Sequence, residues 1–427
     1  MAVRCTELSC EAYKPDTLDY VSASHGGWGI VRMAAQLPEV HLLFVCPSAC
    51  GRHNSLGSAL FGLKERVHYL YLDEEDIIGG DLGKIILENV GRLLEILGYE
   101  PPAILYFTAC IDDLMGTDHE PVLESLHQRH PGMFFRHCTM NPISLDTPNP
   151  PGITTNAQMY SLLMEPKDKT CDKAVNLIGT NVNFREESDL RTILKDHGYA
   201  VRHISDYEHF TDMQEMSRSM LNIVTSPISL RAAREMEKRL GIPWLAAYVN
   251  YDPEEIMEFY RKLSQALGED FTREAETWRQ KAENRIAKLR ERIGDYPLAV
   301  DYQAVLRPYT LAKMLVKHGF HVGMIASDNI APFEKESYRE LQRIAPEILI
   351  ENPMDFSQVR FPHEGEKYLC IGFDCGYMTG SDKVSDLMED TGLYAYDGIL
   401  QLMDMMEAAF EGGSNVREMI VKAGLII

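Results

Sequence analysis

Short apolar runs of strand length alternate with amphipathic stretches of helical spacing over residues 173–249. The apolar runs lie at residues 174–178, 200–204, 221–224 and 244–249, and the amphipathic stretches lie at residues 190–197, 213–220 and 230–240. Repeated alternation at this spacing predicts βαβ units that build a parallel sheet. We therefore predict an α/β domain in the middle of the chain.

Similar patterns occur on both sides of this region. Residues 252–295 contain no proline after Pro253 and carry apolar residues at helical spacing, which predicts a long helical connector. Strands are predicted at residues 40–45, 103–107, 297–302, 321–326, 347–350 and 368–373, and further helices at 309–317 and 398–410. With about 150 residues per domain as a guide, we predict three α/β domains: residues 1–170, residues 171–295 ending in the connector, and residues 296–427.

The net charge and the hydropathy of the chain argue against nucleic acid and membranes as binding partners. The chain has 64 acidic and 42 basic residues, for a net charge of −22. A surface this acidic repels nucleic-acid phosphates and anionic lipid, so we expect neither nucleic-acid nor membrane-surface binding. No apolar run approaches the roughly 18 residues that a membrane span requires.

The first residues lack the apolar core of a signal peptide, so we expect a cytoplasmic, reducing location. The nine cysteines of the chain are then better interpreted as thiols or metal ligands than as a disulfide framework. Fibrous and disordered classes are excluded by an ordinary globular composition with 45% hydrophobic residues.

Three cysteines follow predicted strands. Cys46 and Cys50 flank a turn directly after the strand at residues 40–45, and Cys110 ends the apolar run 103–109. Neighbouring strands of a parallel sheet would bring these ends together, where such sheets bind ligands. Converging thiolates suit an iron–sulfur cluster or zinc. The alternative is that Cys46 and Cys110 are small buried residues of the core.

Nucleotide and hydrolase motifs are absent. Residues 79–85 (GGDLGKI) lack the first glycine and the final Ser or Thr of a phosphate-binding loop, and residues 25–29 (HGGWG) lack the third glycine of a dinucleotide fingerprint. Neither HExxH nor GxSxG occurs. We therefore predict no ATP site in this chain.

Four segments in order along the chain resemble those of one known family. They are YLDEEDIIGGDL at residues 71–82, FTACIDDLMGTD at 107–118, LNIV at 221–224 with GIPW at 241–244, and TGLYAYDG at 391–398. Together they resemble the nitrogenase component 1 family, which includes molybdenum–iron protein subunits, cofactor-scaffold subunits, dark-operative protochlorophyllide reductase and nickel-sirohydrochlorin reductive cyclase. The resemblance spans nearly the whole chain.

The resemblance implies three Rossmann-like domains around a central cleft, in an oligomer with a homologous second subunit or with a copy of itself. It implies an ATP-dependent iron protein as electron donor. It also implies an interface cluster, either [4Fe–4S] or a P-cluster-like [8Fe–7S], for which Cys50 and Cys110 match the second and third ligands. Acidic residues follow at Asp112, Asp113 and Asp118, and we interpret them as either a proton path or a solvated loop.

The chain departs from the family pattern at the first ligand. That cysteine is expected about two dozen residues before Cys50, where this chain has Ser24 and His25. Cys46 could replace the missing thiol, His25 could bind instead, or a partner chain could complete a smaller cluster. We favour Cys46 because thiolate holds cluster iron more commonly than imidazole does.

The family's active-site metallocluster lacks its usual ligands here. Thr225, Ser226 and Pro227 stand where the family's catalytic subunit has a cysteine, and Asp386 or a neighbour stands in place of the histidine. A hydroxyl is a poor ligand for low-valent iron. We therefore predict a nitrogenase-like reductase that does not reduce dinitrogen with the usual cofactor; its substrate is unassigned. The alternatives are a scaffold for metallocluster assembly and a metal-free binding protein with structural cysteines.

Overall fold

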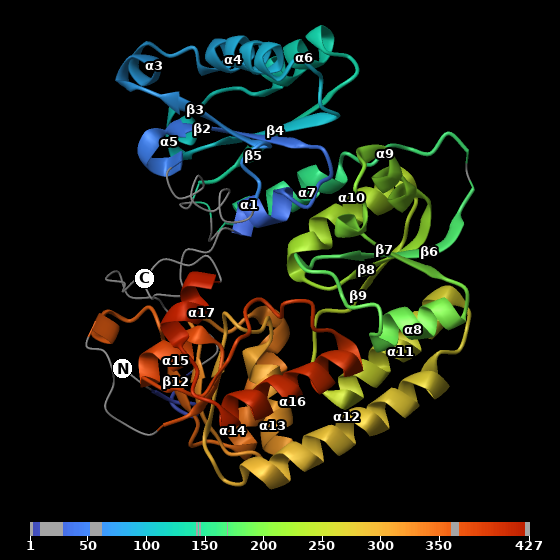
Figure 1. The fold of residues 1–427 in the computed structure, drawn as a ribbon, viewed down its shortest axis with the longest axis vertical. Helices are drawn as coiled ribbons and strands as arrows, with labels where there is room; N and C mark the ends of the chain where they lie inside the picture. The colour runs from blue at the N-terminus through green and yellow to red at the C-terminus, as the bar shows by residue number, and fades with distance from the viewer. Residues whose placement is uncertain are drawn as a thin grey trace. The chain divides into compact units, whose positions relative to one another are not determined.

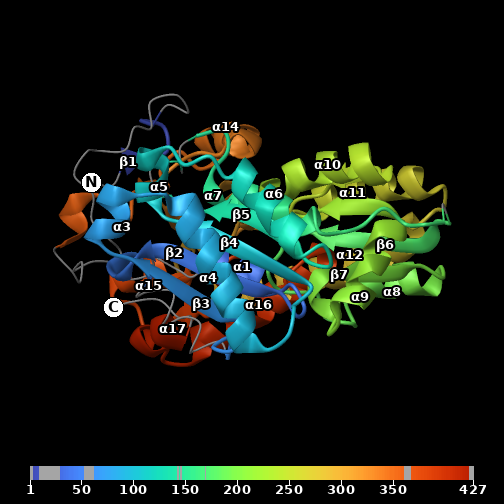
Figure 2. The same ribbon diagram turned by 90° about the horizontal axis from the view of Figure 1, so that it is seen from above.

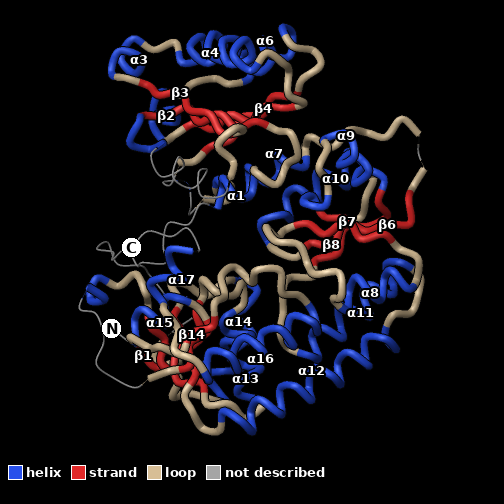
Figure 3. Tube along the Cα trace, viewed as in Figure 1, coloured by secondary structure: helices blue, strands red, loops and turns tan. Residues whose placement is uncertain are grey.

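The computed structural model describes residues 3–8, 29–51, 62–141, 144, 147–168, 170–359 and 367–422. They form a mixed α/β fold with three sheets, as Figure 1 and Figure 3 show. All strand pairs are parallel except one at a sheet edge, so the predicted α/β class is confirmed. None of the helices in these ranges is both long and apolar enough to cross a bilayer.

The chain divides into two compact units. The first comprises Met1–Gly27, Phe184–Gly198 and Ala247–Ile427, and the second comprises Trp28–Asn183 and Tyr199–Ala246. The second unit holds two of the sheets and the first unit holds the third. The predicted division into three domains stays a prediction.

The first sheet of the second unit has the strand order β3-β2-β4-β5. Its strands are β2 (His41–Pro47), β3 (Val67–Leu72), β4 (Ala103–Thr108) and β5 (Phe134–Thr139). Helices α4 (Leu82–Leu97) and α6 (Glu120–Arg129) cover one face, and α1 (Gly29–Ala34) and α7 (Pro151–Tyr160) lie on the other, as Figure 1 and Figure 2 show. Two short helices, α3 (Glu74–Gly79) and α5 (Cys110–Met115), follow strand ends.

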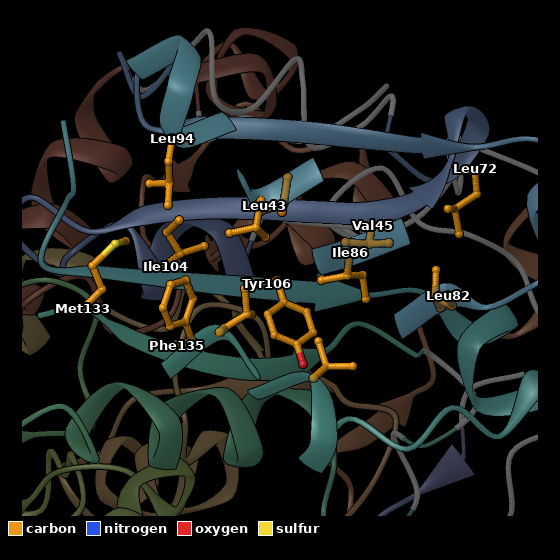
Figure 4. Packing of buried hydrophobic residues seen from close by; sticks show 13 residues of the cluster. Leu43, Val45, Leu72, Leu82, Ile86, Leu94, Ile104, Tyr106, Met133 and Phe135 are labelled. Atoms are coloured by element: carbon orange, nitrogen blue, oxygen red, sulfur yellow. The ribbon is translucent and has the colours of Figure 1, made fainter. Parts of the chain in front are cut away.

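An apolar cluster joins α4 and α6 to this sheet. Figure 4 shows Leu43 and Val45 of β2, Ile104 and Tyr106 of β4, and Ile86 of α4 gathered on one face. The amphipathic pattern of α4 explains this arrangement, because its buried positions recur every four residues. The two central strands, β2 and β4, are buried on both faces, which is why they read as continuous apolar runs.

The second sheet of this unit has the order β7-β6-β8-β9. Its strands are β6 (Asp172–Ile178), β7 (Ala200–His203), β8 (Ser219–Val224) and β9 (Trp244–Ala246), with α10 (Leu230–Leu240) between the last two. The helix predicted at residues 213–220 is wrong: α9 (Phe210–Met213) and a 3-10 turn (Gln214–Arg218) precede β8. Ser219 instead joins the sheet, where its hydroxyl donates to Asn176 Oδ1 at 2.8 Å.

The six-stranded sheet of the first unit has the order β1-β12-β11-β10-β13-β14. Its strands are β1 (Val3–Arg4), β10 (Leu298–Asp301), β11 (Val322–Ala326), β12 (Leu349–Glu351), β13 (Leu369–Ile371) and β14 (Val384–Ser385). β1 pairs antiparallel with β12, and Tyr338 Oη donates to the Cys5 carbonyl at 2.8 Å. A two-residue strand has no periodicity, so β1 was not predicted.

The first unit also contains helices, of which α13 (Pro308–Lys317), α15 (Phe373–Thr379) and α16 (Ala395–Glu411) contact that sheet. The others are α8 (Asp189–Asp196), α11 (Pro253–Leu267), α12 (Thr272–Ile293), α14 (Lys335–Ile344) and α17 (Val416–Lys422). The predicted connector is therefore two helices. Gly268, with a left-handed φ of 71°, ends α11 and allows the chain to turn before α12.

A buried carboxyl in this unit predicts a pH effect on stability. Burial raises the pKa of Glu334 to about 7, above its ordinary 4.5. The native state therefore keeps a proton that the unfolded chain has lost, and stability falls as pH rises through this window. Glu334→Gln stays neutral, so we expect its unfolding free energy relative to wild type to rise by roughly 2 kcal/mol between pH 5.5 and 8.5.

Urea unfolding at the two pH values measures this difference, with the exposed Glu336→Gln as the matched control. Thr310 N–H donates to Glu334 Oε1 at 2.9 Å, and glutamine keeps that acceptor. Parallel pH profiles for wild type and Glu334→Gln would contradict the prediction.

Candidate functional site

The carboxyl ends of β2 and β4 form a topological switch point. β3 lies on one side of β2 and β4 on the other, so the chain leaves these two strands in opposite directions. Val45 is opposite Thr108 in the register, and Ala109 N–H donates to the Val45 carbonyl at 3.4 Å. A helical turn at residues 48–51 and helix α5 both begin here. Crevices at such points are where open α/β sheets bind ligands.

The three predicted cysteines lie at this edge. Cys46 is buried in β2, Cys50 is exposed on the helical turn, and Cys110 is half-buried as the first residue of α5. Burial, and secondarily the nearby Cys50, raise the pKa of Cys46 to about 12. The pKa of Cys50 is also raised, by burial and by Cys110. Cys50 is thus near each of the other two thiols, although the three sulfurs are not all within 4.8 Å of one another. His25 lies outside the described residues.

A close backbone approach positions the Cys50 turn. A Cβ atom at Gly51 would lie 2.7 Å from Tyr71 Cε1, 3.2 Å from Tyr69 Cδ1 and 3.3 Å from Cys46 Sγ. The rings of Tyr69 and Tyr71 stack with centroids 5.7 Å apart, so they form a fixed surface under the turn. Only glycine allows the backbone after Cys50 to pack this tightly against the strands.

Gly51→Ala is therefore expected to displace the turn that carries Cys50. Overpacking of this kind typically costs about 1–3 kcal/mol, to be measured by urea unfolding. The control is Gly91→Ala in α4, where a Cβ meets no atom within 4 Å and alanine favours the helix. Equal stability of the two variants would show that the turn has room to adjust.

The segment at residues 71–82 supports α5. Asp73 caps α3 by accepting hydrogen bonds from the backbone N–H groups of Glu75 and Asp76. At Gly80 a Cβ would lie 2.7 Å from Met115 Cε, at the end of α5. This glycine lets α3 and the end of α5 approach closely. The segment at residues 71–82 therefore has a structural role next to the helix that carries Cys110.

The acidic residues after Cys110 differ in their surroundings. Asp113 and Asp118 are exposed, whereas Asp112 is buried with Oδ2 2.7 Å from His119 Nε2. His137 of β5 is also near, with Nε2 3.9 Å from the same oxygen. Neither histidine was singled out from the sequence, because their spacing matches no metal-binding motif.

The positions expected to hold a second metallocluster have other roles or surroundings. Thr225 is buried, and its hydroxyl donates to the Ile178 carbonyl at 3.2 Å. Asp386 is exposed beside a hollow of about 480 Å³. Cys370 and Cys375 belong to the apolar cluster around β13 and α15, where burial raises the pKa of both thiols. These residues do not present the usual ligands.

The segment at residues 391–398 forms the start of α16. Asp189 accepts hydrogen bonds from the backbone N–H groups of Tyr396 at 3.0 Å and Asp397 at 3.2 Å. Arg185 forms an ion pair with the buried Asp397. The segment therefore anchors α16 to residues 185–189.

Comparisons with known proteins agree with this architecture. A family model described as "Nitrogenase component 1 type Oxidoreductase" matches residues 27–411. The structure described as "Nitrogenase Cp1 at pH 6.5" is similar with a TM-score of 0.70 and 14% identity, covering 94% of this chain and 95% of that chain. "Nitrogenase Cp1 at pH 5" gives a TM-score of 0.63 and 12% identity, covering 96% and 94%. No curated protein sequence matches significantly.

Proposed function

The chain belongs to the nitrogenase component 1 type oxidoreductase family, and we propose that it is a reductase subunit that holds an iron–sulfur cluster with Cys46, Cys50 and Cys110. The observation that supports this proposal is the placement of these cysteines at the adjoining carboxyl ends of β2 and β4, with Cys46 Sγ beside Gly51, the residue that follows Cys50. Electrons would reach the cluster from a protein donor and leave it toward a substrate.

The donor set fits a cluster. Thiolate sulfur is the ligand that iron–sulfur clusters use most, and three cysteines lie at this sheet edge without a local CxxC pair of the kind common in zinc sites. The raised pKa values of Cys46 and Cys50 mean that these thiols are protonated near neutral pH, so loading must release protons. When bound, the cluster would store and pass single electrons. Either [4Fe–4S] or [8Fe–7S] is compatible, with His25 or a partner chain as a further ligand.

The exposure of Cys50 supports an oligomer and a docked donor. An exposed ligand places the cluster at the surface of the chain, where a homologous second subunit or a copy of this chain could cover it. The sequence has no phosphate-binding loop, so the ATP step would belong to a separate iron protein. We propose that partner as the electron donor.

Anaerobic purification tests the proposal. We expect a coloured protein with several iron and sulfide ions per chain, and a paramagnetic signal that changes when an ATP-dependent iron protein and MgATP are added. A colourless, iron-free protein that stays diamagnetic after chemical reduction would leave only a metal-free binding protein. Transfer of the cluster to an acceptor, without reductive turnover, would identify a scaffold instead.

A further inference from the structure

A second set of metal-binding side chains lies on the opposite side of the same sheet from Cys46. His137 is opposite Tyr106 in the register of β5 and β4, and Tyr106 belongs to the apolar cluster under α4 and α6. Cys46 follows Val45 of that cluster, and successive residues of a strand point to opposite faces. Cys46 and His137 therefore lie on opposite faces of this sheet.

The second set consists of Asp112, His119 and His137. One potential ligand atom from each lies within 4.8 Å of the other two. Asp112 Oδ2 is 2.7 Å from His119 Nε2 and 3.9 Å from His137 Nε2. Ligand atoms bound to one Zn²⁺ at about 2.0–2.1 Å are roughly 3.3 Å apart in a tetrahedron, so only small side-chain shifts would bring these atoms onto one ion.

The surroundings suit a cation. The Asp112 and His119 side chains are 4% and 10% exposed, and His137, at 25%, gives access from solvent. Asp112 Oδ1 is buried without a hydrogen bond of ordinary geometry, although the hydroxyls of Thr108 and Thr117 are near this carboxyl. A buried carboxylate oxygen without a regular hydrogen bond calls for an explanation, and a bound cation would supply one.

The two imidazole rings lie against each other. The His119 and His137 rings stack with centroids 3.7 Å apart, a separation at which two charged rings would repel strongly. His119 Nδ1 lies 3.2 Å from Tyr106 Oη, and His137 Nε2 lies 2.8 Å from Thr108 Oγ1. A metal-binding histidine is usually oriented by a hydrogen bond at the ring nitrogen that does not bind the metal. Tyr106 Oη is in this position toward Nδ1 of His119.

We propose that Asp112, His119 and His137 form a mononuclear site for a divalent first-row transition metal. Two imidazoles and one carboxylate are a common protein set for Zn²⁺ and Fe²⁺, and such sets leave positions open for water or another ligand. Thr108 Oγ1 is 2.8 Å from His137 Nε2. If His137 binds the ion through Nε2, this hydrogen bond breaks, and the Thr108 hydroxyl can then contact the water or other ligand in an open position. The site depends on none of the three cysteines.

Co²⁺ binding to the chelator-treated full chain tests the site. A site of nitrogen and oxygen ligands gives visible d–d bands, whereas thiolate ligands add an intense near-ultraviolet charge-transfer band. We expect one Co²⁺ per chain with d–d bands that persist in Cys50→Ala and that Zn²⁺ abolishes by competition. Asp112→Asn, His119→Gln and His137→Gln are each expected to weaken binding by at least about 10- to 100-fold, the loss usual even for an outer partner.

His130→Gln is the matched control, because His130 pairs with Glu100 at 2.7 Å in the same sheet layer but belongs to no group of three potential ligands among the described residues. We expect it to bind Co²⁺ like wild type. In the Cys50→Ala background, Zn²⁺ should raise the melting temperature of the chain with and without His130→Gln but not that of the chain with Asp112→Asn. Co²⁺ bands that disappear in Cys50→Ala, or equal affinity in Asp112→Asn and His130→Gln, would overturn the proposal; neither result bears on iron held by the cysteines.

Discussion

Cys50→Ala is expected to lose the cluster iron while the fold stays intact. The Cys50 side chain is exposed on the helical turn at residues 48–51, so its removal leaves no cavity in the core. Surface substitutions of this kind usually change stability by about 0.5 kcal/mol or less. Iron and sulfide analysis of the anaerobically purified variant measures the loss, and urea unfolding checks the fold.

Cys171→Ala is the control for this experiment. Cys171 is another exposed cysteine of the same unit, beside the start of β6 and away from the ends of β2 and β4. We expect it to keep the full iron content. If Cys50→Ala keeps as much iron as Cys171→Ala, Cys50 is not a ligand and the proposed cluster site is wrong.

The central strands of the sheets could be predicted because they are mostly buried on both faces. The runs at residues 40–45 and 103–107 correspond to β2 and β4, and the run at 221–224 lies within β8. Shorter elements carry too few residues to show a period, which is why β14 and α17 were missed. The predicted connector was a single helix because an isolated glycine such as Gly268 is tolerated within a helical pattern. In the structure Gly268 instead ends α11, and α12 follows as a second helix.

The placement of the cysteines at one sheet edge was predictable from strand ends alone. Parallel strands place their carboxyl ends at one edge, so Cys46 and Cys110 lie at the same edge once β2 and β4 are neighbours. The group formed by Asp112, His119 and His137 was not predictable in this way. It depends on which strand lies beside β4 and on the side chain of a loop residue, and neither leaves a pattern in the sequence.

The family-like segments contribute unequally to chemistry. The segment at 107–118 carries Cys110 and Asp112, and both belong to proposed sites. In contrast, the glycine at Gly80 permits close packing beside α5, and Asp397 pairs with Arg185. At Gly80 and Asp397 the resemblance in sequence therefore reflects the fold. The proposed cluster site instead combines residues from separate parts of the chain.

Asp189→Ala is expected to destabilise the first unit by about 3–5 kcal/mol. The buried Asp189 carboxylate accepts hydrogen bonds from Tyr260 Oη at 2.8 Å and from the backbone N–H groups of Tyr396 and Asp397. Each buried donor that loses its acceptor costs about 1–3 kcal/mol, with some relief where water enters. The start of α16 also loses the negative charge that favours a helix N-terminus. Urea unfolding followed by far-ultraviolet circular dichroism measures the loss.

Two variants separate this effect from a general loss of charge. Asp196→Ala removes an exposed carboxylate from the same helix, α8, and is expected to change stability by about 0.5 kcal/mol or less. Asp189→Asn keeps one acceptor oxygen and should lie between Asp189→Ala and wild type. Hydrogen exchange at the amides of Tyr396 and Asp397 should accelerate in Asp189→Ala, because these groups lose their partner. If Asp189→Ala is no less stable than Asp196→Ala, this carboxylate does not hold α16 in place.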